Sequence, residues 1–412
     1  MKLRLLSLLL ALPLMASAQD FSLEKLMQSK PEQFGRFLEN PAKYRIQILY
    51  TQIDRDKKNH PHFRTYGYRV NAEPYFYPAS TVKLPTSLMA LEKLKKLGIP
   101  RNAPMLTEAG EPGQTAVERD TTATSGLPSV EHYIKKILLV SDNDAFNRLY
   151  EFVGQEALND GLHAKGYKDL RLVHRLSIPL SPEQNRHTNP VRFLDEKGNV
   201  RYRQPMAIGT KNYFPAASLL LGKGYMTGGA NFYGGETLVD KPMDFTQKNY
   251  FSLPDQHEIL KAILFPDDVD KQKRFDITPD DYRFLYQYMS ELPTESKSPK
   301  YPNIWPAVCK FFIYGAEKDA KPTLRIFNKI GGAYGFTLDN AYIVDFDKGI
   351  EFMLTAVIYA NEDEIFNDDK YDYETVGYPF LKYLGQAVYD YELTRQRPRR
   401  PDLTRFRVSY DK

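Results

Sequence analysis

The single cysteine of this chain, Cys309, most strongly limits how its 412 residues can fold. One cysteine excludes an internal disulfide framework, and it excludes zinc or iron–sulfur sites that need several cysteines. A hydrophobic core must therefore hold the fold, and 29 Tyr and 24 Phe supply much of its material. We expect Cys309 to be a small buried side chain without a redox role. The formal net charge of +4 is too small to indicate a nucleic-acid partner.

The first 18 residues have the features of a secretory signal peptide. Lys2 and Arg4 form a basic start, Leu5 to Leu14 is apolar, and residues 16–18 (Ala-Ser-Ala) form a small-residue cleavage site. The apolar run is too short to span a bilayer comfortably. The residue directly after the cleavage site is not a cysteine, so the sequence gives no sign of a bacterial lipid anchor. We therefore expect a cleaved leader and a periplasmic protein.

Hydrophobic patterns predict strands and helices at both ends of the chain. Tyr44 to Ile53 and His62 to Val70 are rich in β-branched and aromatic residues, which predicts a hairpin. Ala341 to Phe346 and Glu351 to Tyr359 predict two more strands. Residues 181–302 are rich in Gly, Pro and Tyr and give few clear signals. The predicted helices cover residues 21–39 with an interruption at Pro31, 81–97, 130–140, 144–153, 280–291 and 372–393.

This order of elements predicts an α/β (α+β) fold, in which terminal helices flank an antiparallel sheet that carries an inserted helical lobe. We expect a single domain over residues 19–412. Its α/β part comprises about 19–79 and 325–393. Its helical part covers about 80–324 and contains a long insertion at about 181–302.

Several charged segments are expected to lie at the surface. The acidic run at 362–364 and 368–369 predicts a solvated loop before the last helix. The tail at 394–412 is basic, and we expect it to be solvated or docked, with contact to an anionic membrane or envelope polymer as the alternative. The seven histidines lack metal-ligand spacing, so no metal or other cofactor is predicted. The tail carries Arg395, Arg397, Arg399, Arg400, Arg405 and Arg407.

The first chemical motif is the tetrad from Ser80 to Lys83, an S-x-x-K pattern at the start of a predicted helix. Residues three apart on a helix share a face, so the Lys83 ammonium is expected beside the Ser80 hydroxyl. A serine becomes a nucleophile when a neighbouring base takes its proton. A lysine crowded by other cations can be that base. The same pattern at Ser22 to Lys25 is interpreted as chemically idle, and a surface helix start is the alternative for an isolated motif.

Two further motifs follow along the chain. Ser141-Asp142-Asn143 interrupts two predicted helices, where a hydroxyl can shuttle a proton and an amide can hold a substrate carbonyl. Capping of the next helix is a compatible alternative. The segment from Lys329 to Gly332 (Lys-Ile-Gly-Gly) puts a cation on a strand before two glycines, whose backbone a substrate can approach closely. A plain strand end is the alternative for this segment alone.

Together, the three motifs resemble those of the class A β-lactamases and, more broadly, of the penicillin-recognising serine hydrolases: S-x-x-K, then S-D-N, then K-T-G. The resemblance covers about residues 42–175 and 325–393. Ser141 to Leu149 is similar to the S-D-N helix of the family. Lys329 to Thr337, with Asp339 to Ala341, is similar to its K-T-G strand and the turn after it.

The resemblance implies a role for each motif residue. Ser80 is the implied acylated nucleophile, and Lys83 is its proton acceptor or relay. Ser141 is the implied proton shuttle to the leaving group, and Asn143 positions the substrate. Lys329 supplies electrostatic support. No cofactor is implied, and the implied partner is a small-molecule or peptidoglycan-type acyl substrate.

The third motif departs from the family pattern in one position. Gly331 and Gly332 match, and the resemblance implies that they border the substrate, with the backbone N–H groups of Ser80 and Gly332 as the oxyanion hole. Ile330, however, stands where the family has threonine or serine. That hydroxyl helps hold the substrate carboxylate in the family, so this kind of carboxylate recognition is not expected here.

The loop after the second motif also departs from the pattern. Class A enzymes carry Arg-x-Glu there, and the glutamate activates the deacylating water. An ungapped extension from Ser141 reaches Arg175-Leu176-Ser177, so a serine replaces the glutamate. A hydroxyl cannot act as a carboxylate base near neutral pH. Glu183 lies six residues further and is the alternative base if the loop folds differently.

Three functional hypotheses follow. The first is a serine acyl hydrolase that uses Ser80 and Lys83 on a β-lactam or on a cell-wall-type amide or ester. The second is a β-lactam or peptidoglycan binder that acylates and barely turns over. The third is a non-catalytic interaction protein on the same scaffold, with the insertion as its contact surface. For the insertion itself, a lid or wall over the cleft and surface elaboration without a catalytic role are the two alternatives.

Overall fold

The computed structural model describes residues 21–70, 74–228, 236–320 and 323–410. The predicted signal peptide, residues 1–18, lies outside this part of the chain. No helix among the described residues is long and apolar enough to cross a membrane.

A five-stranded antiparallel sheet, in the order β14-β15-β16-β1-β2, forms the centre of the molecule. Strand β1 pairs with β16, so segments from the two ends of the chain lie side by side. The predicted hairpin is confirmed as β1 and β2. The strands are β1 (Gln47–Arg55), β2 (Pro61–Tyr68), β14 (Leu324–Ala333), β15 (Phe336–Asp345) and β16 (Ile350–Tyr359).

The position of the β14–β15 turn corrects one expectation. Asp339 to Ala341 lies inside β15, whereas the turn consists of Tyr334 and Gly335. Both turn residues have positive φ, 52° and 75°, as the two central residues of a type I′ hairpin require. Strand β15 therefore begins at Phe336, five residues before the predicted start at Ala341.

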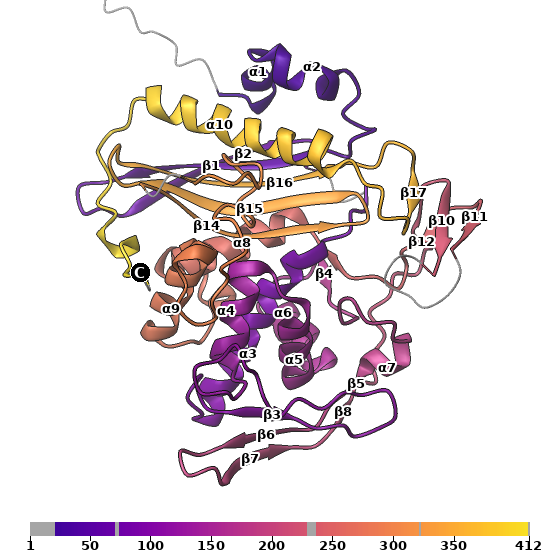
Figure 1. Cartoon of the computed structure of the whole chain (residues 1–412). Coiled ribbons are helices and arrows are strands. Elements are labelled where there is room, and N and C mark those ends of the chain that lie inside the picture. Colours follow the sequence, from indigo (N-terminus) through magenta and orange to yellow (C-terminus); the bar gives the residue numbers. More distant parts are fainter. Residues whose placement is uncertain (1–20, 71–73, 229–235, 321–322, 411–412) are drawn as a thin grey trace, which may run out of the picture.

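Helices cover both faces of the sheet, which explains why β15 and β16 are buried along their whole length. Alternate side chains of a strand point to opposite faces. On β15, Tyr342 and Val344 belong to the core under the helical lobe, whereas Ala341 and Ile343 belong to the core under the terminal helices. Figure 1 shows this layering, with the terminal helices on one side of the sheet and the lobe on the other.

The terminal helices form where the sequence predicts them. The first predicted helix is divided before Pro31 into α1 (Leu23–Gln28) and α2 (Pro31–Glu39). Proline suits the first position of a helix because its missing N–H would be unsatisfied there in any case. The last predicted helix is α10 (Tyr378–Thr394), which follows a π-helical turn at Tyr373–Gly377.

The helical lobe lies against the opposite face of the sheet (Figure 1). The expectation for α9 is confirmed in detail, because Thr278 caps it and Pro279 is its first residue. Helix α8 was not predicted, although Ser252 caps it and its apolar residues have helical spacing. The lobe contains α3 (Lys83–Leu97), α4 (Val130–Val140), α5 (Asn143–Val153), α6 (Gln155–Ala164), α8 (Leu253–Leu264) and α9 (Pro279–Ser290).

The insertion at 181–302 contains short strands as well as helices. Strand β6 joins β3 and β7 in a small sheet at the far end of the lobe, and β13 pairs with β4. Strands β11, β10 and β17 form another small sheet. Three of these short elements lie outside the insertion and pair with its strands: β3 (Met105–Thr107), β4 (Leu170–Arg171) and β17 (Ile365–Phe366). Those within it are α7 (Pro182–Arg186), β5 (His187–Thr188), β6 (Val191–Leu194), β7 (Val200–Gln204), β8 (Ala207–Ile208), β9 (Leu220–Leu221), β10 (Gly224–Thr227), β11 (Thr237–Val239), β12 (Met243–Asp244) and β13 (Tyr250–Phe251).

The basic tail is docked on the protein in its described part. Arg395 forms ion pairs with Glu392 and Asp54, and Arg397 also pairs with Glu392. Further along, Arg405 donates a hydrogen bond to the Tyr286 hydroxyl. These contacts agree with the docked alternative, while contact with an anionic envelope surface stays a prediction.

Candidate active site

Ser80 lies in a short 3₁₀ turn, η1 (Ala79–Val82), directly before α3. Ala79 has a φ of 48°, a left-handed conformation that is strained in a residue with a side chain. Such strain is commonly found where the fold must aim a functional group. The hydroxyl of Ser80 is half-exposed and makes no hydrogen bond within the described residues, so it is open to a ligand.

Lys83 is completely buried one turn after Ser80. Its ammonium donates hydrogen bonds to the backbone carbonyl of Ser141, to Ser141 Oγ at 3.2 Å and to Asn143 Oδ1 at 2.6 Å. Burial holds the pKa of Lys83 well below its ordinary value, and the nearby charge of Lys329 lowers it further. Both effects shift Lys83 toward the neutral amine, which can accept a proton.

Lys329 reaches the same serine from β14. Its Nζ donates to Ser141 Oγ and to the carbonyl of Ile330, both at 2.8 Å. Burial lowers the pKa of Lys329 to about 8. Ser141 ends α4 in a left-handed conformation, with a φ of 61°, which turns the chain between α4 and α5. The side chains of the three sequence motifs thus meet at one hydroxyl.

Asp142 and Asn143 divide two tasks that the sequence left open. The Asp142 carboxylate accepts a hydrogen bond from the backbone N–H of Ala145 at 2.8 Å, so Asp142 is the N-cap of α5. The Asn143 amide instead bridges Lys83 and the following loop. Its Nδ2 donates to Ser177 Oγ at 2.7 Å, while its Oδ1 accepts from Lys83.

The glycines of the third motif lie where β14 passes η1, the turn that carries Ser80. A Cβ on Gly331 would come within 2.9 Å of the Pro78 carbonyl and 3.2 Å of the Ser80 nitrogen, so only glycine fits without a shift. A Cβ on Gly332 would meet nothing within 4 Å. Gly332 therefore faces open space, and the backbone of β14 forms one wall beside Ser80.

A cavity of about 350 Å³ opens beside Ser80. Ser80, Asn143, Ser177 and Gly332 line it, whereas Lys83, Ser141, Lys329 and Gly331 do not. The lining residues are Tyr77, Ala79, Ser80, Asn143, His174, Arg175, Leu176, Ser177, Ile178, Lys248, Gly332, Ala333, Tyr334, Asn367, Asp369, Tyr371 and Tyr373.

Sequence reasoning missed most of the aromatic wall of this cavity. Tyr371 and Tyr373 follow the acidic run that was expected to be only a solvated loop. Lys248 comes from the insertion, and no local pattern marks it as a lining residue. It reaches the cavity only because β13 pairs with β4, a contact between distant segments.

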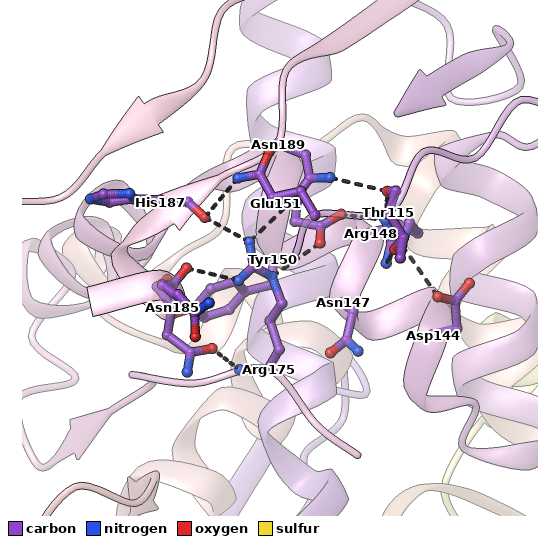
Figure 2. A network of polar contacts seen from close by, with 12 residues as sticks. Thr115, Asp144, Asn147, Arg148, Tyr150, Glu151, Arg175, Asn185, His187 and Asn189 are labelled. Atoms are coloured by element: carbon purple, nitrogen blue, oxygen red, sulfur yellow. Dashed lines mark hydrogen bonds and ion pairs between the residues drawn. The ribbon is translucent and has the colours of Figure 1, made fainter. Parts of the chain in front are cut away.

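The loop that holds Ser177 is anchored by a buried polar network (Figure 2). The Arg175 guanidinium forms an ion pair with Glu151 at 3.0 Å, and it donates to the carbonyls of Gln184 and His187. Arg148 also pairs with Glu151, at 2.9 Å. These contacts fix the backbone on both sides of the loop and leave Ser177 at the cavity.

Neutralising the centre of this network is expected to destabilise the protein strongly. The Glu151→Gln substitution keeps the side-chain volume, leaves the buried Arg175 without a counter-charge and leaves Arg148 with Asp144 alone, which should lower the free energy of unfolding by about 3 kcal/mol. Equilibrium urea unfolding measures this change. Glu118→Gln is the matched control, because Glu118 is 68% exposed in its pair with Arg192, and its loss should cost below about 1 kcal/mol. An equal decrease in the free energy of unfolding in the two variants would contradict a structural role for the network.

Glu183 is not brought to the cavity. It is exposed in the first turn of α7, where Ser181 forms the cap, and it does not line the cavity. Asp369 is the carboxylate among the lining residues, and it is exposed. In the described part of the chain, no group of three His, Cys, Asp or Glu side chains is placed to hold a metal ion.

Comparisons with known proteins complete this description. The chain matches the beta-lactamase enzyme family over residues 36–391. No curated protein matches it. Among solved structures it is similar to a beta-lactamase from Sphaerobacter thermophilus, with 12% identity, 90% of this chain and 96% of that chain covered, and a TM-score of 0.45. A beta lactamase from Xanthomonas campestris has 15% identity and a TM-score of 0.48, with 90% of this chain and 98% of that chain covered. A beta-lactamase from Burkholderia phymatum has 14% identity and a TM-score of 0.48, with 90% of this chain and 100% of that chain covered.

Proposed function

This chain belongs to the beta-lactamase enzyme family, and on that premise we propose that it is an exported serine hydrolase that forms an acyl-enzyme at Ser80. The observation that carries the proposal is the meeting of the Lys83 and Lys329 side chains at Ser141 Oγ, with the half-buried Ser80 one turn before Lys83 and in the wall of the cavity. Two buried lysine side chains in contact with one hydroxyl have little purpose in a purely structural site, because burial and mutual repulsion both disfavour their charged forms. The predicted leader adds export to the periplasm to the proposal.

Acylation proceeds by proton transfer between these groups. The Ser80 oxygen attacks the carbonyl carbon of a β-lactam or of a cell-wall-type amide or ester, while its proton passes to the neutral amine of Lys83. The backbone N–H groups of Ser80 and Gly332 receive the oxyanion, and the charge of Lys329 supports it. When the bond to the leaving group breaks, Ser141 hands that group a proton and is reprotonated by Lys83.

Deacylation is slow in this proposal. It requires a base that takes a proton from water. Ser177 offers only a hydroxyl, and that hydroxyl accepts a hydrogen bond from the Asn143 amide. The same observation favours a second candidate function, a binder that acylates and barely turns over. The two differ only in the rate at which the acyl-enzyme is hydrolysed.

A chromogenic cephalosporin tests both candidates at once. We expect a rapid burst close to the molar amount of protein, followed by a slow steady state, and a mass increase that maps to the peptide containing Ser80. A steady state as fast as the burst would contradict slow deacylation. The absence of any adduct would leave the non-catalytic interaction protein as the remaining function.

Restoring a carboxylate at the loop position is expected to speed turnover. Ser177→Glu should raise the steady-state rate by about 10²-fold and leave the burst rate nearly unchanged, because a carboxylate can take a proton from water. Rapid-mixing kinetics separate the two phases. Glu183→Gln is the control, since its side chain is exposed on α7 and both phases should stay as they are. No gain in Ser177→Glu would mean that position 177 does not face the hydrolytic water.

A further inference from the structure

The wall of the cavity includes Ser80 but not the side chains that are proposed to transfer its proton. Ser141 and Lys329 do not line it, whereas Gly332, Tyr334 and Ser177 do. In the proposed function, on which this inference rests, the leaving group is protonated by Ser141 and must lie on its side. The acyl part of the substrate then occupies the cavity.

Lys248 stands in the wall of this cavity on a firmly held backbone. Its N–H donates to the carbonyl of Phe245 at 3.0 Å, and its carbonyl accepts from Arg171 Nε at 3.2 Å. The next residue, Asn249, is fully buried, and its side chain bonds the backbone of Val173 and His174. The insertion thus fixes Lys248 beside the loop that carries Ser177.

The ammonium of Lys248 has no carboxylate partner within the described residues. Its contacts are with Tyr334, whose hydroxyl lies 3.5 Å away and whose ring centroid lies 5.6 Å away. The other lining cation, Arg175, is neutralised by Glu151. The lining carboxylate, Asp369, is exposed and forms no ion pair with Lys248. A half-buried cation left without a counter-charge is a ready partner for an anionic ligand group.

The remaining wall suits an apolar linker. The rings of Tyr77, Tyr334, Tyr371 and Tyr373 border the cavity. Tyr77 stacks on His174, and burial with the charge of Lys248 lowers the pKa of His174 to about 3, so this ring is neutral. His174 therefore adds no second positive charge to that of Lys248 in the cavity wall.

We infer that the cavity is the pocket for the acyl group of the substrate, and that Lys248 selects acyl groups that carry an anion at the end of an apolar stem. Lys248 is in this role a specificity-determining residue, separate from the groups that carry out the chemistry at Ser80.

Three matched p-nitrophenyl esters test the inference with the full chain: adipoyl (anionic), hexanoyl (neutral) and ω-trimethylammoniohexanoyl (cationic). In each, Ser80 forms the new ester, p-nitrophenolate leaves with the bonding electron pair, and the serine proton goes to Lys83. The burst of p-nitrophenolate gives the acylation rate constant, corrected for the background rate with the Ser80→Ala variant. We expect the adipoyl ester to acylate about tenfold faster than the hexanoyl ester.

Variants of Lys248 should move this ratio and leave the chemistry intact. Lys248→Met should slow the adipoyl ester about tenfold while the hexanoyl rate changes less than about twofold, Lys248→Arg should keep the preference, and Lys248→Glu should shift it to the cationic ester. Lys241→Met is the control, because Lys241 is an exposed lysine of the same insertion that does not line the cavity. An unchanged ratio in Lys248→Met and Lys248→Glu would overturn the inference and leave Ser80 acylation standing. Failure of all three esters to acylate Ser80 would overturn the proposed function and, with it, the pocket assignment.

Discussion

Replacing Ser80 by alanine is expected to slow acylation about 10⁶-fold and to abolish the covalent adduct, because the variant lacks the oxygen that attacks the carbonyl carbon in the proposed mechanism. Intact-protein mass spectrometry after incubation with a β-lactam measures the adduct, and burst kinetics measure the rate. The cavity itself should survive, since Ser80 makes no side-chain hydrogen bond within the described residues. A non-covalent complex should therefore still form.

The chain supplies its own control for this experiment. Ser22 and Lys25 have the same spacing as Ser80 and Lys83, yet Ser22 only caps α1, where its Oγ accepts from the Lys25 backbone at 3.4 Å. Lys25 is exposed, whereas Lys83 is completely buried. The Ser22→Ala variant should form the same covalent adduct with the β-lactam as the unsubstituted protein does. An adduct that persists in Ser80→Ala would place the nucleophile elsewhere.

Replacing Lys83 by methionine is expected to slow acylation about 10⁴-fold, the upper range for loss of a general base. Methionine has a similar length and suits a buried site, so the fold should be retained. Rapid-mixing kinetics with the hexanoyl ester report the acylation step directly. Lys93→Met is the control: Lys93 is a half-buried lysine of α3, and it donates hydrogen bonds to Gln204 and to the carbonyl of Phe152, away from the cavity. Equal rates in both variants would contradict Lys83 as the proton acceptor.

The pH dependence of acylation gives an independent signature of the same two lysines. The base must be neutral, and the pKa of Lys83 is held well below its ordinary value, so the rate should fall on acidification, at a pH well below the ordinary pKa of a lysine. Lys329 must keep its charge, and its pKa is about 8, so the rate should fall again above pH 8. Lys329→Met should remove the basic limb. It should also move the acidic limb upward, because a neighbouring positive charge no longer lowers the pKa of Lys83.

Local patterns could predict the elements that carry the chemistry, and they could not predict what surrounds it. The spacing of Ser80 and Lys83 and the break at Ser141 are visible within short stretches, because helix geometry fixes which side chains share a face. The Asn143–Ser177 hydrogen bond and the Glu151–Arg175 pair join residues that a single sequence does not connect. Those contacts depend on how the loop folds back over α5.

The insertion shows the same limit more sharply. Helix α9 was predicted from its cap and its first-turn proline, whereas α8 was missed although Ser252 and the apolar residues after it carry comparable signals. The short strands of the insertion have no stable pattern of their own, since two- to five-residue strands depend on their partners. Lys248 and Asn249 acquire their positions from pairing with residues near 171, which local periodicity cannot show.

The pairing of β1 with β16 has a consequence for the timing of assembly. The turn that carries Ser80 packs on β14, and β14 joins the sheet through β15 and β16. A nascent chain that ends before residue 359 therefore contains Ser80 and the helix with Lys83, but it lacks the complete sheet on which they pack. Closure of such a long loop carries an entropic cost that is met only when the distant strands dock. The reactivity proposed for Ser80 would thus appear late, after the C-terminal segment has docked on the sheet.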